Sequence, residues 1–163
     1  IHVGGNTETE MREKKDRVDD ALNATKAAIE EGIVPGGGAA LVYARQTISN
    51  TNTVGGNIVY KACASPFLKI LSNAGYDNIT SIGLINKMVD SGDDAWKGYN
   101  IKTNKFVNTK KTGIIDPLKV TRSALENAAS IAGTILLTET VMVDEKEEGN
   151  NSNEQFGGMP GMY

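Results

Sequence analysis

The carboxylates of Asp19 and Asp20 are the first side chains in this sequence whose type and position allow chemistry. They are adjacent in a helical pattern, so they point about 100° apart and cannot share a proton or a metal ion as a pair. At most one of them can therefore be catalytic. The alternative is a solvated helix face, which the usual exposure of charged residues favours on its own.

The glycine run Gly36-Gly37-Gly38 is the second candidate. It follows Pro35 and leads into an apolar stretch at 39–44, where the first amides of a helix would be open to an approaching ligand. Glycines in such a place let the backbone come close to the phosphate or sugar of a nucleotide. No Lys-Ser/Thr pair follows, so the run is not a P-loop. A flexible turn between two helices explains it at least as well.

Asp116 and Asn100 are further candidates, and each also has a simple structural explanation. Asp116 stands before Pro117, a pair typical of a helix start in which the carboxylate accepts amide hydrogen bonds. A contact with a ribose is the alternative for this carboxylate. Asn100 follows Gly98 and Tyr99 at an expected hairpin tip, where asparagine tolerates a positive φ.

The sequence contains one histidine and one cysteine. His2, near the first residue, supports neither a histidine-based nucleophile nor a zinc site, and no metal ligands are predicted. Cys63 lies in an apolar helical pattern, which predicts a small buried side chain in a reducing compartment.

Helices dominate the expected secondary structure. Thr7 and Glu10 form a capping box, which predicts a helix from that point to Gly32. Pro66 is expected to kink or break a later helix, and Gly75 to end it. Further predicted elements are a strand at 1–3, a helix through 82–89, a β-hairpin between 91 and 111, a long helix starting at Asp116-Pro117 and a strand at 138–143. The predicted fold is mainly α, with a small β-hairpin and edge strands that lack partners within the chain.

Charge and hydropathy argue against two classes of partner. The 17 Lys and Arg residues against 20 Asp and Glu residues give a net charge of −3, so no basic field is available to hold nucleic acid. The longest apolar stretches, such as 131–137, are far too short to span a bilayer. Beyond Asp144 the chain is acidic and rich in Asn, Gly and Met, and disorder is expected there. Two classes of function remain open: a nucleotide-using machine and a helical oligomerisation module without nucleotide.

Four segments of the chain resemble the GroEL-type chaperonins of bacteria and organelles, in the same order and spacing. They read TETEMREKKDRVDDAL at 7–22, EEGIVPGGGAAL at 30–41, GYN at 98–100 and GIIDPLKVTRSAL at 113–125. The likeness extends from Ile1 to about Asp144, and the ending Gly-Gly-Met-Pro-Gly-Met is similar to a shortened form of the family's Gly/Met tail. Archaeal and eukaryotic-cytosolic chaperonins lack that tail, which favours the bacterial and organellar group.

The resemblance implies the C-terminal third of a subunit built from apical, intermediate and equatorial domains. Residues 1–31 match the returning intermediate-domain segment, a long helix, and residues 32–144 match the C-terminal part of the helical equatorial domain. Residues 145–163 are the expected disordered tail. The family's phosphate-binding loop, its Mg²⁺-binding carboxylate and its apical substrate-binding domain are expected before Ile1.

The resemblance also assigns roles to individual residues. Asp20 matches the carboxylate that orients or deprotonates the water attacking the γ-phosphate of ATP, while Asp19 stays a surface residue. The remaining matched positions surround the nucleoside: Gly37 on the ribose side, Asp116 on the ribose hydroxyls, and Asn100, Ile101 and Ile114 around the adenine. At position 101 the family commonly has alanine; a contact through the backbone amide would tolerate Ile101, whereas its larger side chain would tighten the adenine pocket.

The implied activity is that of an ATPase that assists protein folding, with ATP and Mg²⁺ as cofactors. The implied partners are copies of the same subunit in two stacked heptameric rings, a co-chaperonin lid and unfolded client proteins, with neither nucleic acid nor membrane among them. The implied location is the bacterial cytoplasm, or the mitochondrial or plastid matrix. The 163-residue chain alone is expected not to hydrolyse ATP, because the matched segments supply no phosphate-binding groups.

Overall fold

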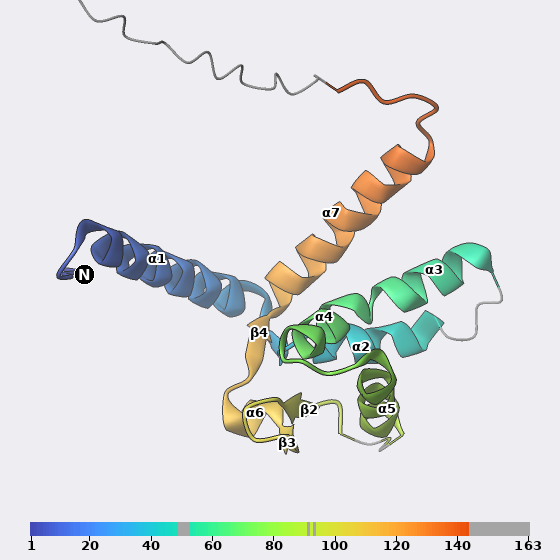
Figure 1. Cartoon of the computed structure of the whole chain (residues 1–163), viewed down its shortest axis with the longest axis horizontal. Helices are drawn as coiled ribbons and strands as arrows, with labels where there is room; N and C mark the ends of the chain where they lie inside the picture. The colour runs from blue at the N-terminus through green and yellow to red at the C-terminus, as the bar shows by residue number, and fades with distance from the viewer. Residues whose placement is uncertain (49–52, 91, 93, 144–163) are drawn as a thin grey trace, which may run out of the picture.

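The computed structural model describes residues 1–48, 53–90, 92 and 94–143, and this part of the chain is mainly helical, as predicted (Figure 1). In chain order the elements are α1 (Glu8–Glu31), β1 (Ile33–Pro35), α2 (Ala39–Ala44), the 3-10 helix η1 (Arg45–Ile48), α3 (Val54–Ala62), α4 (Ser65–Asn73), α5 (Asn78–Val89), β2 (Lys97–Asn100), β3 (Lys105–Asn108), α6 (Thr109–Thr112), β4 (Ile115–Pro117) and α7 (Leu118–Leu136). The tail expected to be disordered, 145–163, lies outside the described residues.

Helix α1 begins and ends where the sequence predicts. The Thr7 hydroxyl accepts a hydrogen bond from the Glu10 amide at 3.1 Å. The Glu10 carboxylate accepts one from the Asn6 amide at 2.9 Å, one residue before the amide that a standard capping box would satisfy. At the other end Gly32 has φ +86, which a glycine adopts at no steric cost. Neither α1 nor α7 buries a residue, and both extend away from the remaining helices (Figure 1).

The predicted break at Pro66 is confirmed. Helix α3 ends at Ala62, and α4 begins at Ser65 with Pro66 in its first turn, where the missing N–H of proline has no partner to lose. Gly75 follows α4 with φ +88, so the chain reverses there into α5. Cys63, between α3 and α4, is buried as predicted, and that burial raises the pKa of its thiol.

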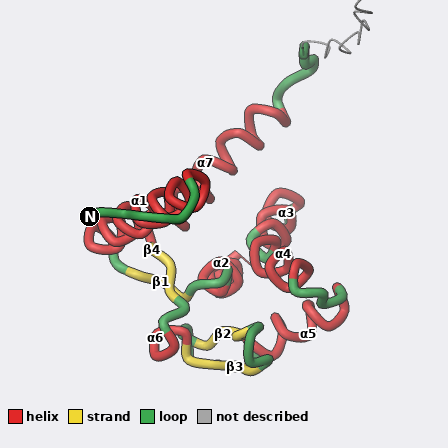
Figure 2. The backbone as a smooth tube through the Cα atoms, turned by 60° about the vertical axis from the view of Figure 1, so that its left-hand side comes forward, coloured by secondary structure: helices red, strands yellow, loops and turns green. Residues whose placement is uncertain are grey.

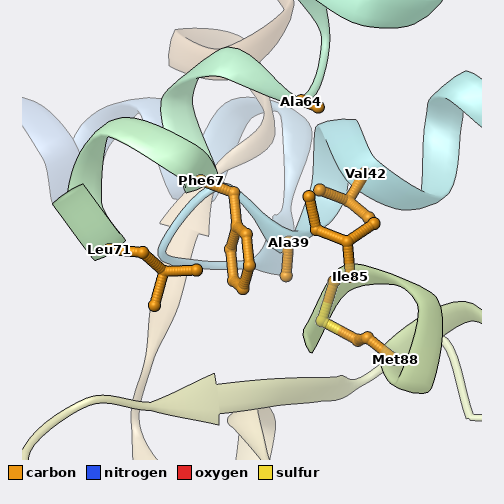
Figure 3. Packing of buried hydrophobic residues seen from close by; sticks show 7 residues of the cluster. All are labelled: Ala39, Val42, Ala64, Phe67, Leu71, Ile85 and Met88. Atoms are coloured by element: carbon orange, nitrogen blue, oxygen red, sulfur yellow. The ribbon is translucent and has the colours of Figure 1, made fainter. Parts of the chain in front are cut away.

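The hydrophobic core lies between α2, α4 and α5 (Figure 3). Its buried members are Ala39, Val42, Ala64, Phe67, Leu71, Ile85 and Met88. Gly38 lies directly against this core with φ +82, and a Cβ on it would stand 2.8 Å from the Phe67 amide nitrogen. The last glycine of the run is therefore required by packing, because it lets the start of α2 approach α4.

Two small antiparallel sheets complete the described fold (Figure 2). Strands β2 and β3 form the predicted hairpin, with Tyr99 opposite Phe106. Strands β1 and β4, which the sequence analysis did not predict, pair with each other, with Val34 opposite Asp116.

Three predictions about element ends were wrong. Asp116 does not cap a helix with Pro117 inside it, because Asp116 lies in β4 and Pro117 is the residue before the first turn of α7. Residues 1–3 and 138–143 form no strand, since no neighbouring strand in the described residues offers them backbone partners.

Among the described residues no helix is both long and apolar enough to cross a membrane.

Candidate functional site

The β1–β4 ladder carries Asp116 to the glycine run. Asp116 pairs with Val34, which stands two residues before the turn at Gly36 and Gly37. The Gly37 backbone N–H therefore lies close enough to the Asp116 carboxylate to interact with it. Burial raises the pKa of Asp116, and the Gly37 N–H opposes that rise in part. The result is a half-buried carboxylate facing a main-chain amide, an arrangement that can accept hydroxyl donors from a bound ligand.

Ile114 lies against the same glycines. The Gly36 amide donates to the Ile114 carbonyl oxygen at 2.9 Å, and a Cβ on Gly36 would stand 2.9 Å from the Ile114 carbonyl carbon. A Cβ on Gly37 would meet only the Ile114 Cγ2 methyl, at 3.8 Å. The structure thus brings together three of the predicted site residues: Gly37, Ile114 and Asp116.

Asn100 and Ile101 lie at the tip of the β2–β3 hairpin. The Asn100 side-chain oxygen accepts a hydrogen bond from the Lys102 amide at 3.0 Å, so this side chain stabilises the hairpin turn. Ile101 is half-buried and packs against the core. Among the described residues no hydrogen bond joins either one to Gly37 or Asp116.

The base of the hairpin, however, adjoins the start of α2. A Cβ on Gly98 would stand 3.9 Å from the Ala39 Cβ, two residues beyond Gly37. Tyr99 packs edge-on against Phe106, with ring centroids 5.3 Å apart, and against Tyr76, at 6.1 Å. The hairpin is therefore held on the same helical body as the glycine run.

Asp20 is exposed on α1, one helical turn before Ala24, and among the described residues no hydrogen bond or ion pair joins it to Gly37, Ile114 or Asp116. At about 1.5 Å per residue it lies about 17 Å along the axis from the last residue of the helix. The structure does not bring its carboxylate to the Gly37–Asp116 pair.

Helix α1 is attached at its C-terminal end. The Leu118 amide donates to the Gly32 carbonyl at 3.0 Å, and Glu30 forms an ion pair with Lys119. Arg122 bridges Glu31, at 2.6 Å, and Glu126, and its guanidinium lowers the pKa of Glu31. We refer to the Glu30–Lys119 and Glu31–Arg122 pairs as the α1–α7 ion pairs.

A shallow groove of about 180 Å³ separates α1 from the β1–β4 ladder, and sequence reasoning did not predict it. Ala24 and Ala28 form its α1 side, while Ile33, Ile115 and Asp116 form the opposite side. The signal in the sequence was the run of alanines on α1, whose small side chains leave space beside the ladder. Within the described residues no cluster of three or more His, Cys, Asp or Glu side chains could hold a metal ion.

Comparison with known proteins agrees with this architecture. Residues 1–146 match the model of the TCP-1/cpn60 chaperonin family. A solved structure, the crystal structure of a group III chaperonin in the open state, superposes with a TM-score of 0.75 at 25% identity over 86% of this chain. The chain spans about 30% of the length of that protein. Because the family model covers most of the sequence, the chain belongs to the TCP-1/cpn60 chaperonin family.

Proposed function

We propose that this chain is the C-terminal part of an ATP-dependent ring chaperonin subunit of the GroEL type, and that it carries the nucleoside side of the ATP site. The observation that carries the proposal is the meeting of Gly37 with Ile114 and Asp116, which lie far from it in sequence, at the β1–β4 ladder. Residues 1–31 would belong to the intermediate domain and residues 32–144 to the equatorial domain. The Gly/Met-rich ending favours the bacterial and organellar group.

The chemistry of the meeting residues fits a nucleoside. A carboxylate such as Asp116 accepts two hydroxyl donors, which matches the vicinal hydroxyls of ribose. Gly37 exposes backbone without a side chain, and the Ile114 methyl beside it offers an apolar wall for a base. Asn100 and Ile101 would bound the adenine on the hairpin side. When bound, ATP would supply the phosphoanhydride bond that is hydrolysed and Mg²⁺ would neutralise charge on its phosphates. Both would be held by parts of the subunit outside this chain.

Asp20 would orient or deprotonate the attacking water when α1 moves toward the nucleotide. The attachment of α1 supports this role, because its hydrogen bond and ion pairs to α7 are made by Glu30, Glu31 and Gly32 at its C-terminal end, while its other end extends away from the helical body (Figure 1). Gly32 would act as the hinge, since its φ of +86 suits a glycine and no atom lies within 4 Å of where its Cβ would stand. Asp19, on a different face of the same helix, would have no role in hydrolysis.

The proposed assembly is a pair of stacked heptameric rings with a co-chaperonin lid and unfolded proteins as clients. In the bacterial case it would work in the cytoplasm, and otherwise in the mitochondrial or plastid matrix. The exposed apolar side chains of α7 support burial against further protein, since Ile131 is 62% exposed and Leu136 is 81% exposed. The same exposure favours the second candidate, a helical oligomerisation module that binds no nucleotide.

Nucleotide binding and turnover by the full-length subunit separate the two candidates. Asp116→Ala should weaken ATP binding, measured by calorimetric titration, because the ribose loses its acceptor. Asp20→Ala should leave binding nearly intact and slow phosphate release by orders of magnitude, because the carboxylate acts on water. Asp19→Ala is the matched control and should change neither. A parent subunit that forms rings without binding ATP would favour the oligomerisation module.

A further inference from the structure

Thr109, the first residue of α6, is a buried side chain to which none of the roles above assigns a function. It is 1% exposed. Its backbone N–H donates to the Trp96 carbonyl oxygen at 2.7 Å, and its hydroxyl donates to the same oxygen at 2.9 Å. Two donors on one acceptor fix the chain immediately before β2 to the start of α6.

The other side of Thr109 leads to the glycine run. The Ile114 amide donates to the Thr109 carbonyl oxygen at 2.9 Å, and the Ile114 carbonyl accepts from the Gly36 amide, also at 2.9 Å. A continuous chain of hydrogen bonds therefore runs from the hairpin through Thr109 to the residues beside Gly37 and Asp116.

The Thr109 methyl group is equally constrained. A Cβ on Gly98 would stand 2.4 Å from the Thr109 Cγ2, far inside van der Waals contact, so only glycine fits opposite this methyl. The hydroxyl toward Trp96 and the methyl toward Gly98 together set one orientation of the side chain. The Thr109 side chain thus holds the start of α6 to Trp96, just before β2, and to Gly98 within β2.

We propose that Thr109 is a positioning residue of the nucleoside pocket, which holds the adenine side, Asn100 and Ile101, at a set distance from the ribose side, Ile114 and Asp116. The inference rests on the proposed nucleotide-binding function and deepens it by assigning base selectivity to this junction. A ligand anchored at Asp116 meets the hairpin at the correct place only while the hairpin is locked. Loosening the junction shifts the base contacts and leaves the ribose contacts where they are.

The test uses the full-length subunit with Thr109→Val and Thr109→Ser, and measures the Kd values of ADP and GDP beside the thermal unfolding temperature. In Thr109→Val a methyl replaces the hydroxyl at 2.9 Å from the Trp96 oxygen, shorter than the roughly 3.3 Å that a carbon needs. We expect ADP to bind about tenfold more weakly, the equivalent of one lost hydrogen bond. GDP should bind with little change, so the ADP-over-GDP preference falls about tenfold. Thr109→Ser keeps the hydroxyl and should keep that preference.

Three outcomes would overturn the inference. An unchanged ADP-over-GDP preference in Thr109→Val contradicts it, and so does an equal loss for both nucleotides with a lower unfolding temperature, which marks a purely structural role. Loss of the preference in Thr109→Ser assigns the effect to the methyl and contradicts the hydroxyl lock. If Thr109→Val does not fold, Thr109→Ala removes the hydroxyl without added bulk and the same ratios apply. A parent subunit that binds no ADP would remove the proposed function, whereas a binding parent with unaffected variants removes this inference alone.

Discussion

Gly98→Ala is the most demanding test of the junction between the hairpin and α6, because the structure gives its steric conflict in numbers. The new methyl group would stand 2.4 Å from the Thr109 Cγ2. Neither backbone can retreat easily, since β2 is paired with β3 and Thr109 donates twice to Trp96. Overpacking of this kind costs about 1–3 kcal/mol, and the stiffer unfolded chain of alanine offsets about 0.5–1 kcal/mol of it. We expect a net loss of about 1–2 kcal/mol.

The double variant separates this conflict from a general weakness of the strand. Thr109→Ser removes the Cγ2, after which the nearest atoms to an alanine methyl at position 98 are the Cβ atoms of Ala39 and residue 109, both at 3.9 Å. Thr109→Ser alone should cost about 1 kcal/mol for the lost methyl. Gly98→Ala combined with Thr109→Ser should then be at least as stable as Thr109→Ser alone, a coupling of about 1–2 kcal/mol.

Denaturant titration of the 163-residue chain, followed by circular dichroism, measures all four free energies of unfolding. For a chain of this size the single Gly98→Ala change corresponds to a shift of about 2–8 °C in Tm. Additive losses in the double variant would refute the packing argument, because they would mean that the two groups do not touch.

Three further predictions concern charged and ionisable groups. Burial raises the pKa of Asp116 above its ordinary value of 3.8. The folded chain therefore loses stability as the pH rises from 3.8 through the raised pKa, where the unfolded chain has already lost its proton. Asp116→Asn should therefore be at least as stable as the parent at neutral pH in urea titrations, with the advantage fading on acidification towards 3.8. Burial raises the pKa of Tyr43 from 10.0 to about 12, so the parent should lose stability between pH 10 and 12 as the unfolded chain ionises first. Tyr43→Phe should reduce that alkaline loss while costing about 1 kcal/mol for the hydrogen bond of its hydroxyl, and an unchanged alkaline profile would contradict the assignment. Arg122→Gln should broaden the distance distribution between fluorophores on α1 and α7, as should high salt in the parent. The stability of the chain should change little, because the ion pairs are exposed to solvent. A distribution that neither change affects would mean that the α1–α7 ion pairs do not restrain α1.

Local signals predicted the helices well because their causes are local. The capping box at Thr7 and the break at Pro66 depend on hydrogen bonds within one turn of chain, and both are observed. The glycine run precedes a helix as expected. Its last member, Gly38, also has a positive φ and approaches Phe67 closely.

Pairing between distant segments could not be predicted in the same way. Strands β1 and β4 have three residues each, too few for an alternating pattern, and they are separated by most of the described chain. Asp116-Pro117 carried an equally good local explanation as a helix start, so only the ladder with Val34 assigns it to a strand. The prediction of a strand at 138–143 was wrong for the opposite reason: the alternating, β-branched pattern is present, but no strand in the described residues pairs with it.

The residues of the candidate site were likewise predictable only where their signals are local. Residue types alone favoured a surface role for Asp20 and a capping role for Asp116, and only the family resemblance assigned them to a nucleotide. The contact of Gly37 with Asp116 depends on a fold-level pairing that no local pattern encodes. Nothing in the sequence singles out Thr109, because the residues that bury its side chain, Trp96 and Gly98, are distant from it along the chain.

In the proposed movement of α1 about Gly32, the length of the helix sets how far each of its residues travels. The 24 residues of α1 contain neither glycine nor proline, so rotation at one end reaches the other with little bending. Asp20 lies about 18 Å from Gly32 along the axis, so a rotation of about 10° displaces its carboxylate by about 3 Å. Met11 would travel nearly twice as far for the same rotation. An insertion of one helical turn between Asp20 and Gly32 would lengthen that arm by about 5 Å and alter its stroke without changing any residue at the pivot.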